Sequence, residues 1–90
     1  MKGCGGNHTI MIGGNGKVYS MGYGEYGQLG VDKKLLDNNN ILSTPTLIYK
    51  FILENVFITS VSCGKFHSIF LSKSGEIFSC GLFFFFFSKN

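Results

Sequence analysis

Cys-Gly-Gly-Asn-His-Thr-Ile-Met-Ile, at residues 4–12, returns as Cys-Gly-Lys-Phe-His-Ser-Ile-Phe-Leu at residues 63–71. The sequence repeat continues downstream, where Gly-Lys-Val-Tyr-Ser-Met-Gly at 16–22 matches Gly-Glu-Ile-Phe-Ser-Cys-Gly at 75–81. Each matched pair of positions lies 59 residues apart. A fixed period of this size is typical of stacked or radial arrays in which each repeat covers the apolar face of its neighbour. The sequence therefore predicts about one and a half units of a repeat protein.

Each copy of the repeat predicts an antiparallel β-hairpin. Residues 66–72, and residues 7–12 in the first copy, alternate with the period of a strand, which places His67, Ile69 and Leu71 on one face. A short reversal containing glycine follows each copy, and a second alternating arm follows the reversal. This local pattern predicts one β-hairpin in each copy of the repeat.

The segment between the two copies predicts loops followed by two strands. Residues 23–30 form a glycine-rich loop, and the polar, asparagine-rich stretch 31–44 is interpreted as a solvated insertion. Residues 46–51 and 56–61 are rich in β-forming side chains, and Pro45 suits the start or the edge of a sheet.

The combined pattern of the repeat resembles that of the regulator of chromosome condensation family. The resemblance covers residues 4–81 and is most specific in Tyr-Gly-Glu-Tyr-Gly-Gln-Leu-Gly at 23–30. It implies blades of a seven-bladed β-propeller, each of four antiparallel strands, so the expected fold class is all-β, a fragment of a β-propeller. Three positions depart from the family pattern: Met21 and Cys80 stand where Trp is usual, and Gly24 stands where Asn is common.

The expected domain organisation follows the repeat. Residues 1–82 form the repeat region, with a first unit at 4–62 and a partial second unit at 63–82. Residues 83–90 form a low-complexity tail that contains five consecutive Phe residues. Because this run stands where the glycine-rich loop of the second unit is due, it is typical of an interrupted repeat.

Most motif residues are expected to have structural roles in the repeat. Glycines permit close backbone approach and positive φ, and the histidines occupy strands beside glycines, where a bond to a backbone group of a neighbouring strand is expected. The predicted structural residues are Gly5, His8, Gly16, Gly22, Gly27, Gln28, Leu29, Gly30, Gly64, His67, Gly75 and Gly81.

Two pairs of Cys and His raise the question of a zinc site. Cys4 and His8, and Cys63 and His67, are residue types that zinc accepts. Both pairs occupy the same position of the repeat, so in a radial array they belong to different units. We therefore expect no metal and no cofactor, and a catalytic Cys–His pair is disfavoured by the same argument.

Other enzymatic patterns are also disfavoured. Gly-Tyr-Gly-Glu-Tyr-Gly at 22–27 spells a phosphate-loop pattern, but no helix-forming run follows its last glycine. The five carboxylates show no pairing that suggests acid–base chemistry. We expect this chain not to be an enzyme.

Charge and cysteine content limit the expected partners and location. The net charge of +3 comes from dispersed lysines, which is not the clustered pattern of a nucleic-acid-binding surface. Three cysteines without a Cys-x-x-Cys pair favour a reducing compartment, so an intracellular location in the nucleus or cytoplasm is expected. The apolar run 82–87 is too short to cross a membrane, so no membrane partner is expected.

The expected function is protein binding by the complete propeller. Tyr23, Glu25, Tyr26, Lys33 and Lys34 lie on or after the inter-strand loop and form a candidate partner-binding loop, although Tyr26 alternatively packs over the rim of a blade. The resemblance implies an interaction scaffold and, for the founding family member, guanine-nucleotide exchange on a Ran-like small GTPase with chromatin binding. Two alternatives stay open: a docking propeller of a larger ubiquitin ligase or kinase, and a truncated fragment without function.

Overall fold

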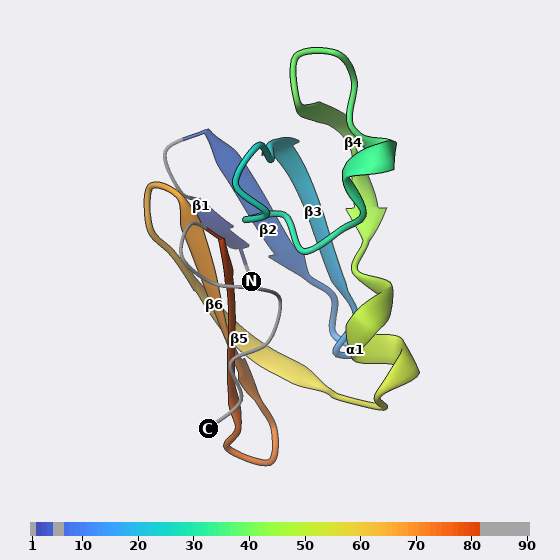
Figure 1. Cartoon of the computed structure of the whole chain (residues 1–90). Coiled ribbons are helices and arrows are strands. Elements are labelled where there is room, and N and C mark those ends of the chain that lie inside the picture. Colours follow the sequence, from blue (N-terminus) through green and yellow to red (C-terminus); the bar gives the residue numbers. More distant parts are fainter. Residues whose placement is uncertain (1, 5–6, 82–90) are drawn as a thin grey trace.

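The computed structural model describes residues 2–4 and 7–81 as two antiparallel β-sheets (Figure 1). The first sheet has the order β1-β2-β3-β4, and the second has the order β5-β6-β7. The strands are β1 (Lys2–Cys4), β2 (His8–Ile12), β3 (Val18–Tyr23), β4 (Ile41–Leu47), β5 (Ile58–Cys63), β6 (His67–Ser72) and β7 (Ile77–Gly81). The all-β prediction is confirmed. The predicted Phe-rich tail, 83–90, lies outside the described residues.

The two repeats form equivalent hairpins with the same register. In the first, His8 pairs with Gly22, and in the second, His67 pairs with Gly81. The sheet-forming unit begins earlier than the sequence repeat, because β5 starts at Ile58, before the second Cys-Gly pair, and joins the second sheet. Each copy of the sequence repeat therefore begins at the end of the first strand of a sheet, just before the hairpin of that sheet.

The segment that joins the sheets differs from the expectation. Residues 46–51 were expected to form a strand, but β4 starts at Ile41, inside the predicted insertion, and ends at Leu47. Helix α1 (Tyr49–Leu53) follows, and its turn directs both Ile48 and Phe51 into the core, a burial that overrides the β propensity of the segment.

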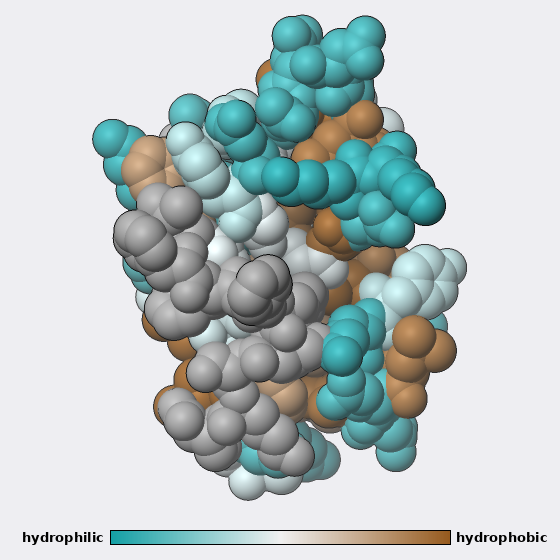
Figure 2. Space-filling model, in the orientation of Figure 1, coloured by the Kyte–Doolittle hydropathy of each residue, from teal (hydrophilic) through white to brown (hydrophobic). Residues whose placement is uncertain are grey.

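Two polar elements lie outside the sheets. The 3-10 helix η1 (Lys33–Leu35) and the turn at 37–40 form hydrophilic surface beside β4 at the top of the molecule (Figure 2). Pro45 lies on β4, an edge strand of the first sheet, where its missing N–H is tolerated. No helix in the described ranges is long and apolar enough to cross a bilayer.

The two sheets pack face to face, and equivalent residues of the repeats are buried on opposite sides. Ile10 is fully buried, whereas its equivalent Ile69 is 37% exposed. Val18 is buried and its equivalent Ile77 is 40% exposed. Conversely, Phe78 is buried, whereas its equivalent Tyr19 is only partly buried. This reversal is what consecutive units of a stacked array require, because one face of each unit covers the opposite face of the next.

Aromatic packing closes the core at the end of the sheets that carries α1. The Phe51 ring lies edge-on to Phe70 at 4.9 Å and to Phe78 at 5.5 Å between centroids. Such edge-to-face pairs are stabilising beyond their buried area by about 0.5–1.5 kcal/mol each. The connecting helix therefore anchors the first repeat to the second. The core cluster consists of Ile10, Val18, Ile48, Phe51, Ile58, Phe70, Phe78 and Cys80.

Candidate functional site

The loop after β3 turns inward and enters the contact between the sheets. Gly27 and Gly30 have φ values of 82° and 69°, a conformation that side chains with a Cβ rarely adopt. Their amides close successive turns, with Gly27 N–H donating to the Gly24 carbonyl and Gly30 N–H to the Gly27 carbonyl, each at 3.1 Å. These turns place Gln28 and Leu29 in the interior, where both are 1% exposed.

Side chains from both sheets satisfy the carbonyl groups of this loop. Ser20 Oγ, on β3, donates to the Leu29 carbonyl at 2.8 Å. Ser68 Oγ, on β6, donates to the Gln28 carbonyl at 2.7 Å, and Cys80 Sγ approaches the same carbonyl at 3.6 Å. Because buried carbonyl groups are costly when unpaired, the loop of the first repeat depends on residues of the second. These partners were not predicted from the sequence, although Ser20 recurs in the repeat as Ser79.

His8 extends this network across the two sheets. Its Nε2 lies 2.9 Å from Ser68 Oγ. The single hydroxyl proton of Ser68 is donated to Gln28, so His8 Nε2 must carry the proton of this bond. The partner of Nε2 is a hydroxyl of the next repeat, and the backbone of His67, where a backbone partner was expected, also acts on the His8 ring.

The environment of His8 favours its neutral form. The side chain is buried, and its Nδ1 lacks a hydrogen-bond partner of normal geometry among the described residues. Burial lowers the pKa of His8, the backbone of His67 raises it in part, and the charge of His67 lowers it further. In the neutral ring, Nδ1 is an unprotonated acceptor, which is the cheaper state for a buried nitrogen without a partner.

Equivalent glycines close the hairpins against the preceding turns. A Cβ at Gly22 would lie 2.5 Å from the Asn7 carbonyl oxygen, and one at Gly81 would lie 2.3 Å from the Phe66 carbonyl oxygen. Both glycines also have positive φ. Gly64 similarly leaves room for the ring of His67, which a Cβ would meet at 2.0 Å.

The remaining predicted structural glycines lie in reversals. Gly16 and Gly75 hold equivalent positions in the two hairpin turns, with φ values of 78° and 91°. Phe57 packs over Gly16, whereas Gly75 faces open space. Gly5 lies outside the described residues.

An aromatic cluster joins the two repeats at the loop end of the sheets. The rings of Tyr23 and Tyr26 lie 6.3 Å apart, and Tyr26 lies 5.0 Å from Phe66 of the second repeat, both pairs edge-on. Lys65 Nζ lies 5.4 Å from the centre of the Phe66 ring. Tyr26 is still 38% exposed, so it packs against the neighbouring repeat and also presents surface.

Glu25 shapes the polar edge of this cluster. The Tyr23 hydroxyl donates a hydrogen bond to Glu25, and this bond is the main cause that raises the pKa of Tyr23 to about 12. Lys33 and Lys34 lie apart from it on η1, where both are exposed and Asp32 accepts from the Lys34 amide. Of the predicted partner-binding loop, the structure therefore brings Tyr23, Glu25 and Tyr26 together. It adds Lys65 and Phe66, which the sequence did not predict.

The described residues offer no metal or phosphate centre. Residues 2–4 and 7–81 contain no group of three or more His, Cys, Asp or Glu side chains placed to hold a metal ion. After Gly27, the last glycine of the phosphate-loop pattern, the chain forms tight turns with Gln28 buried, so no helix N-terminus faces outward there.

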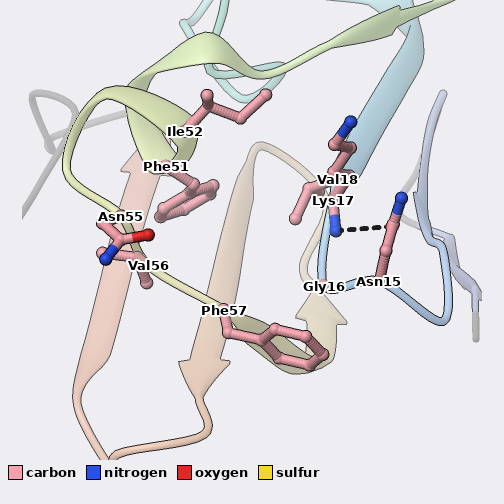
Figure 3. Close-up of a pocket in the computed structure, with 9 residues that line it drawn as sticks. All are labelled: Asn15, Gly16, Lys17, Val18, Phe51, Ile52, Asn55, Val56 and Phe57. Atoms are coloured by element: carbon pink, nitrogen blue, oxygen red, sulfur yellow. Dashed lines mark hydrogen bonds between the residues drawn. The ribbon is translucent and has the colours of Figure 1, made fainter.

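A shallow groove of about 200 Å³ lies at the opposite end of the sheets, between the first hairpin turn and α1 (Figure 3). Phe51 and Val18 point into it, and Phe57 lies below Gly16 at its edge. Asn15 Oδ1 accepts from the Lys17 amide and is thereby used within the turn. No carboxylate or histidine lines the groove, so it lacks an acid–base pair.

The chain matches known repeat proteins in sequence and in structure. The model of the regulator of chromosome condensation (RCC1) repeat matches residues 15–71, and a second RCC1 repeat model matches residues 58–85. The human RCC1-like G exchanging factor-like protein is 35% identical over 78 residues, covering 87% of this chain and 16% of the relative. The human probable E3 ubiquitin-protein ligase HERC6 is 37% identical over 78 residues, which cover 87% of this chain and 7% of that relative.

The solved structures show the same likeness. Prp20p from Saccharomyces cerevisiae, described with its binding to Gsp1p and histones, superposes with a TM-score of 0.75 at 30% identity, covering 90% of this chain and 18% of that one. The chain thus spans a small share of the proteins it matches. Two stacked sheets, an inserted Gly-Gln-Leu-Gly loop and a family model that matches more than half of the residues lead to one conclusion: the chain belongs to the RCC1 repeat family.

Proposed function

We propose that this chain is a segment of an RCC1-type β-propeller that acts as a protein-binding scaffold, with the Tyr23–Tyr26–Phe66 cluster as part of the binding surface. The observation that carries the proposal is the contact of Tyr26 with Phe66 across two repeats, with Tyr26 still 38% exposed. Aromatic residues that are rigidly held and partly exposed are enriched at protein interfaces.

A small GTPase is the partner that the relatives support best. One relative is named a G exchanging factor-like protein, and the matched yeast structure is described with its binding to Gsp1p and histones. Because the chain corresponds to a small share of these proteins, the proposed contribution is a contact surface, and exchange activity would belong to the complete propeller. We place this scaffold in the nucleus or cytoplasm, on the basis of the odd cysteine count.

The similarity to HERC6 favours a second candidate, a docking propeller attached to a ubiquitin ligase. In that case the same cluster would bind a protein other than a GTPase. Any catalysis would then belong to another domain of that ligase.

A direct binding measurement separates the two candidates. Purified Gsp1p in its nucleotide-free form is titrated onto the immobilised chain, with the Tyr26→Ala variant beside it. Binding that weakens at least about tenfold in Tyr26→Ala, corresponding to about 1.4 kcal/mol, supports the GTPase proposal. Absence of binding to the unmodified chain overturns it. Lys50→Ala, on α1 at the far end of the sheets, is the matched control and should bind normally.

A further inference from the structure

Helix α1 is apolar on the side where a surface helix is normally polar. A helix that packs on a core usually carries charged and polar residues on its opposite face. Helix α1 buries Phe51, yet its outward side chains Tyr49, Ile52 and Leu53 are 64%, 40% and 80% exposed. Part of this hydrophobic surface is visible over α1 at the right of Figure 2. Exposed apolar side chains that gather in one place indicate an interaction site.

A groove beside this helix is large enough for one side chain. This α1 groove has a volume of about 200 Å³ (Figure 3). One wall is the turn at 15–17 and the other is Ile52 with the segment 55–57, while Val18 and Phe51 point into the space between them. A cavity of about 150 Å³ is sufficient to hold a benzene ring, so an aromatic or large aliphatic side chain fits here.

The α1 groove is formed within the chain, where the two repeats meet. Its first wall belongs to the hairpin of β2 and β3, and its second wall belongs to the segment that connects the two sheets. Further repeats of a stacked array pack on the broad faces of the sheets. The groove opens at the end of the sheets, and its walls are complete without any residue outside 15–57.

The charges around the α1 groove favour an acidic ligand. Lys17 stands in the first wall, and neither Asp nor Glu lines the groove. Lys73 Nζ lies 5.5 Å from the centre of the Phe57 ring, which belongs to the second wall. The neighbouring carboxylates of Glu54 and Glu76 line a separate hollow that shares Phe57 with the groove. The groove therefore combines an apolar floor with positive charge at both walls.

We propose that the α1 groove binds a short acidic segment of another protein. One aromatic or large aliphatic side chain of that segment enters the groove, and its carboxylates lie beside Lys17 and Lys73. Asn15 and Asn55 also line the groove and offer side-chain amides to the backbone of the bound segment. A ligand held by one inserted side chain and two lysines should bind with a Kd of about 10–100 µM.

The α1 groove and the Tyr23–Tyr26–Phe66 cluster lie at opposite ends of the sheets. A segment bound in the groove would therefore be additional to the partner bound by that cluster, and each can be tested without the other.

Selection from a random library of short peptides displayed on phage tests the ligand chemistry. The immobilised chain is the target, and peptides that bind the bare matrix are removed first. Enriched peptides should carry several Asp or Glu residues beside one aromatic or large aliphatic residue. Enrichment of basic or uncharged peptides overturns the proposal, and so does a selection without enrichment.

Fluorescence polarisation with the most enriched peptide tests the groove itself. Lys17→Glu and Ile52→Glu place a carboxylate on either wall, so each should weaken binding at least about tenfold. Lys17→Arg retains the positive charge and should bind like the parent chain. Leu35→Glu makes the same apolar-to-acidic change on η1, away from the groove, and should also bind normally. Replacing the apolar residue of the peptide by Ala should abolish binding.

Circular dichroism of each variant confirms that the sheets are intact before binding is compared. Unchanged binding in both Lys17→Glu and Ile52→Glu would place the peptide elsewhere on the chain and overturn the proposal. An equal loss of binding in Leu35→Glu and Ile52→Glu would also overturn it, because the effect would then be one of net charge and not of the groove.

Discussion

His8 Nε2 lies 2.9 Å from Ser68 Oγ, across the contact between two sheets whose equivalent residues are 59 positions apart. The Ser68 hydroxyl in turn donates a hydrogen bond to the Gln28 carbonyl. This one hydroxyl on β6 therefore links His8 on β2 with the inserted loop that carries Gln28. The two repeats are therefore held together by a buried polar link as well as by apolar packing.

Replacing Ser68 by Ala should destabilise the chain by about 1–3 kcal/mol, because the change removes the hydroxyl partner of His8 Nε2 and leaves the Gln28 carbonyl with only the weak Cys80 thiol contact. The free energy of unfolding in urea measures the loss. Ser43→Ala, at an exposed position of the edge strand β4, is the control and should change stability by less than about 0.5 kcal/mol. Equal stability of Ser68→Ala and the parent chain would mean that the link contributes nothing.

Acidification should destabilise the fold through His8. The pKa of His8 is lowered in the folded state by burial, so the unfolded chain takes up the proton first as the pH falls. Stability is therefore complete above the unfolded pKa of about 6.5 and declines as the pH falls from there toward the folded pKa. The urea midpoint should drop more between about pH 7.5 and about pH 5.5 in the parent chain than in His8→Gln. The same drop in both chains would assign the pH dependence to other groups.

A graded series of glycine replacements should separate backbone strain from steric contact. Gly14→Ala faces open space without positive φ and should be nearly neutral. Gly27→Ala also faces open space, but its φ of 82° is strained for Ala, so a loss of about 1 kcal/mol is expected. Gly81→Ala adds a clash with the Phe66 carbonyl oxygen and should lower the thermal midpoint most. A different order of midpoints would contradict the assigned roles.

Cys80 should resist alkylation in the folded chain. Its side chain is 1% exposed, and burial raises the pKa of its thiol to about 12. Because the thiolate is the reactive form, iodoacetamide at mildly alkaline pH should label Cys63, which is partly exposed, well before Cys80. Peptide mass spectrometry gives both rates from one sample. Labelling of Cys80 as fast as in urea would show that the contact between the sheets is open.

The local features of the fold could be predicted from the sequence, because they depend on short-range patterns. Strand alternation in 7–12 and 66–72 and the recurring Gly22 and Gly81 were sufficient to predict both hairpins. Helix α1 was missed because residues 46–51 have β propensity, which the burial of Phe51 against the second sheet overrides.

Contacts between the repeats could not be predicted in detail. The bond from His8 to Ser68 and the packing of Tyr26 on Phe66 join residues far apart in the sequence, and no local pattern identifies such pairs. The repeat did predict that equivalent residues share a face. Which of the two equivalents is buried depends on the order of stacking, so Ile10 is in the core and Ile69 is on the surface.

A nuclear Overhauser experiment on the His8 ring protons tests directly whether His8 and Ser68 join the two sheets. Cross-peaks are expected from His8 to the β protons of Ser68, together with a nitrogen shift typical of a protonated Nε2. Cross-peaks from His8 to its pairing partner Gly22 are the internal control for a folded first hairpin. If the control peaks appear and the peaks to Ser68 do not, the two sheets fold without stacking, and the repeats are not joined through His8 and Ser68.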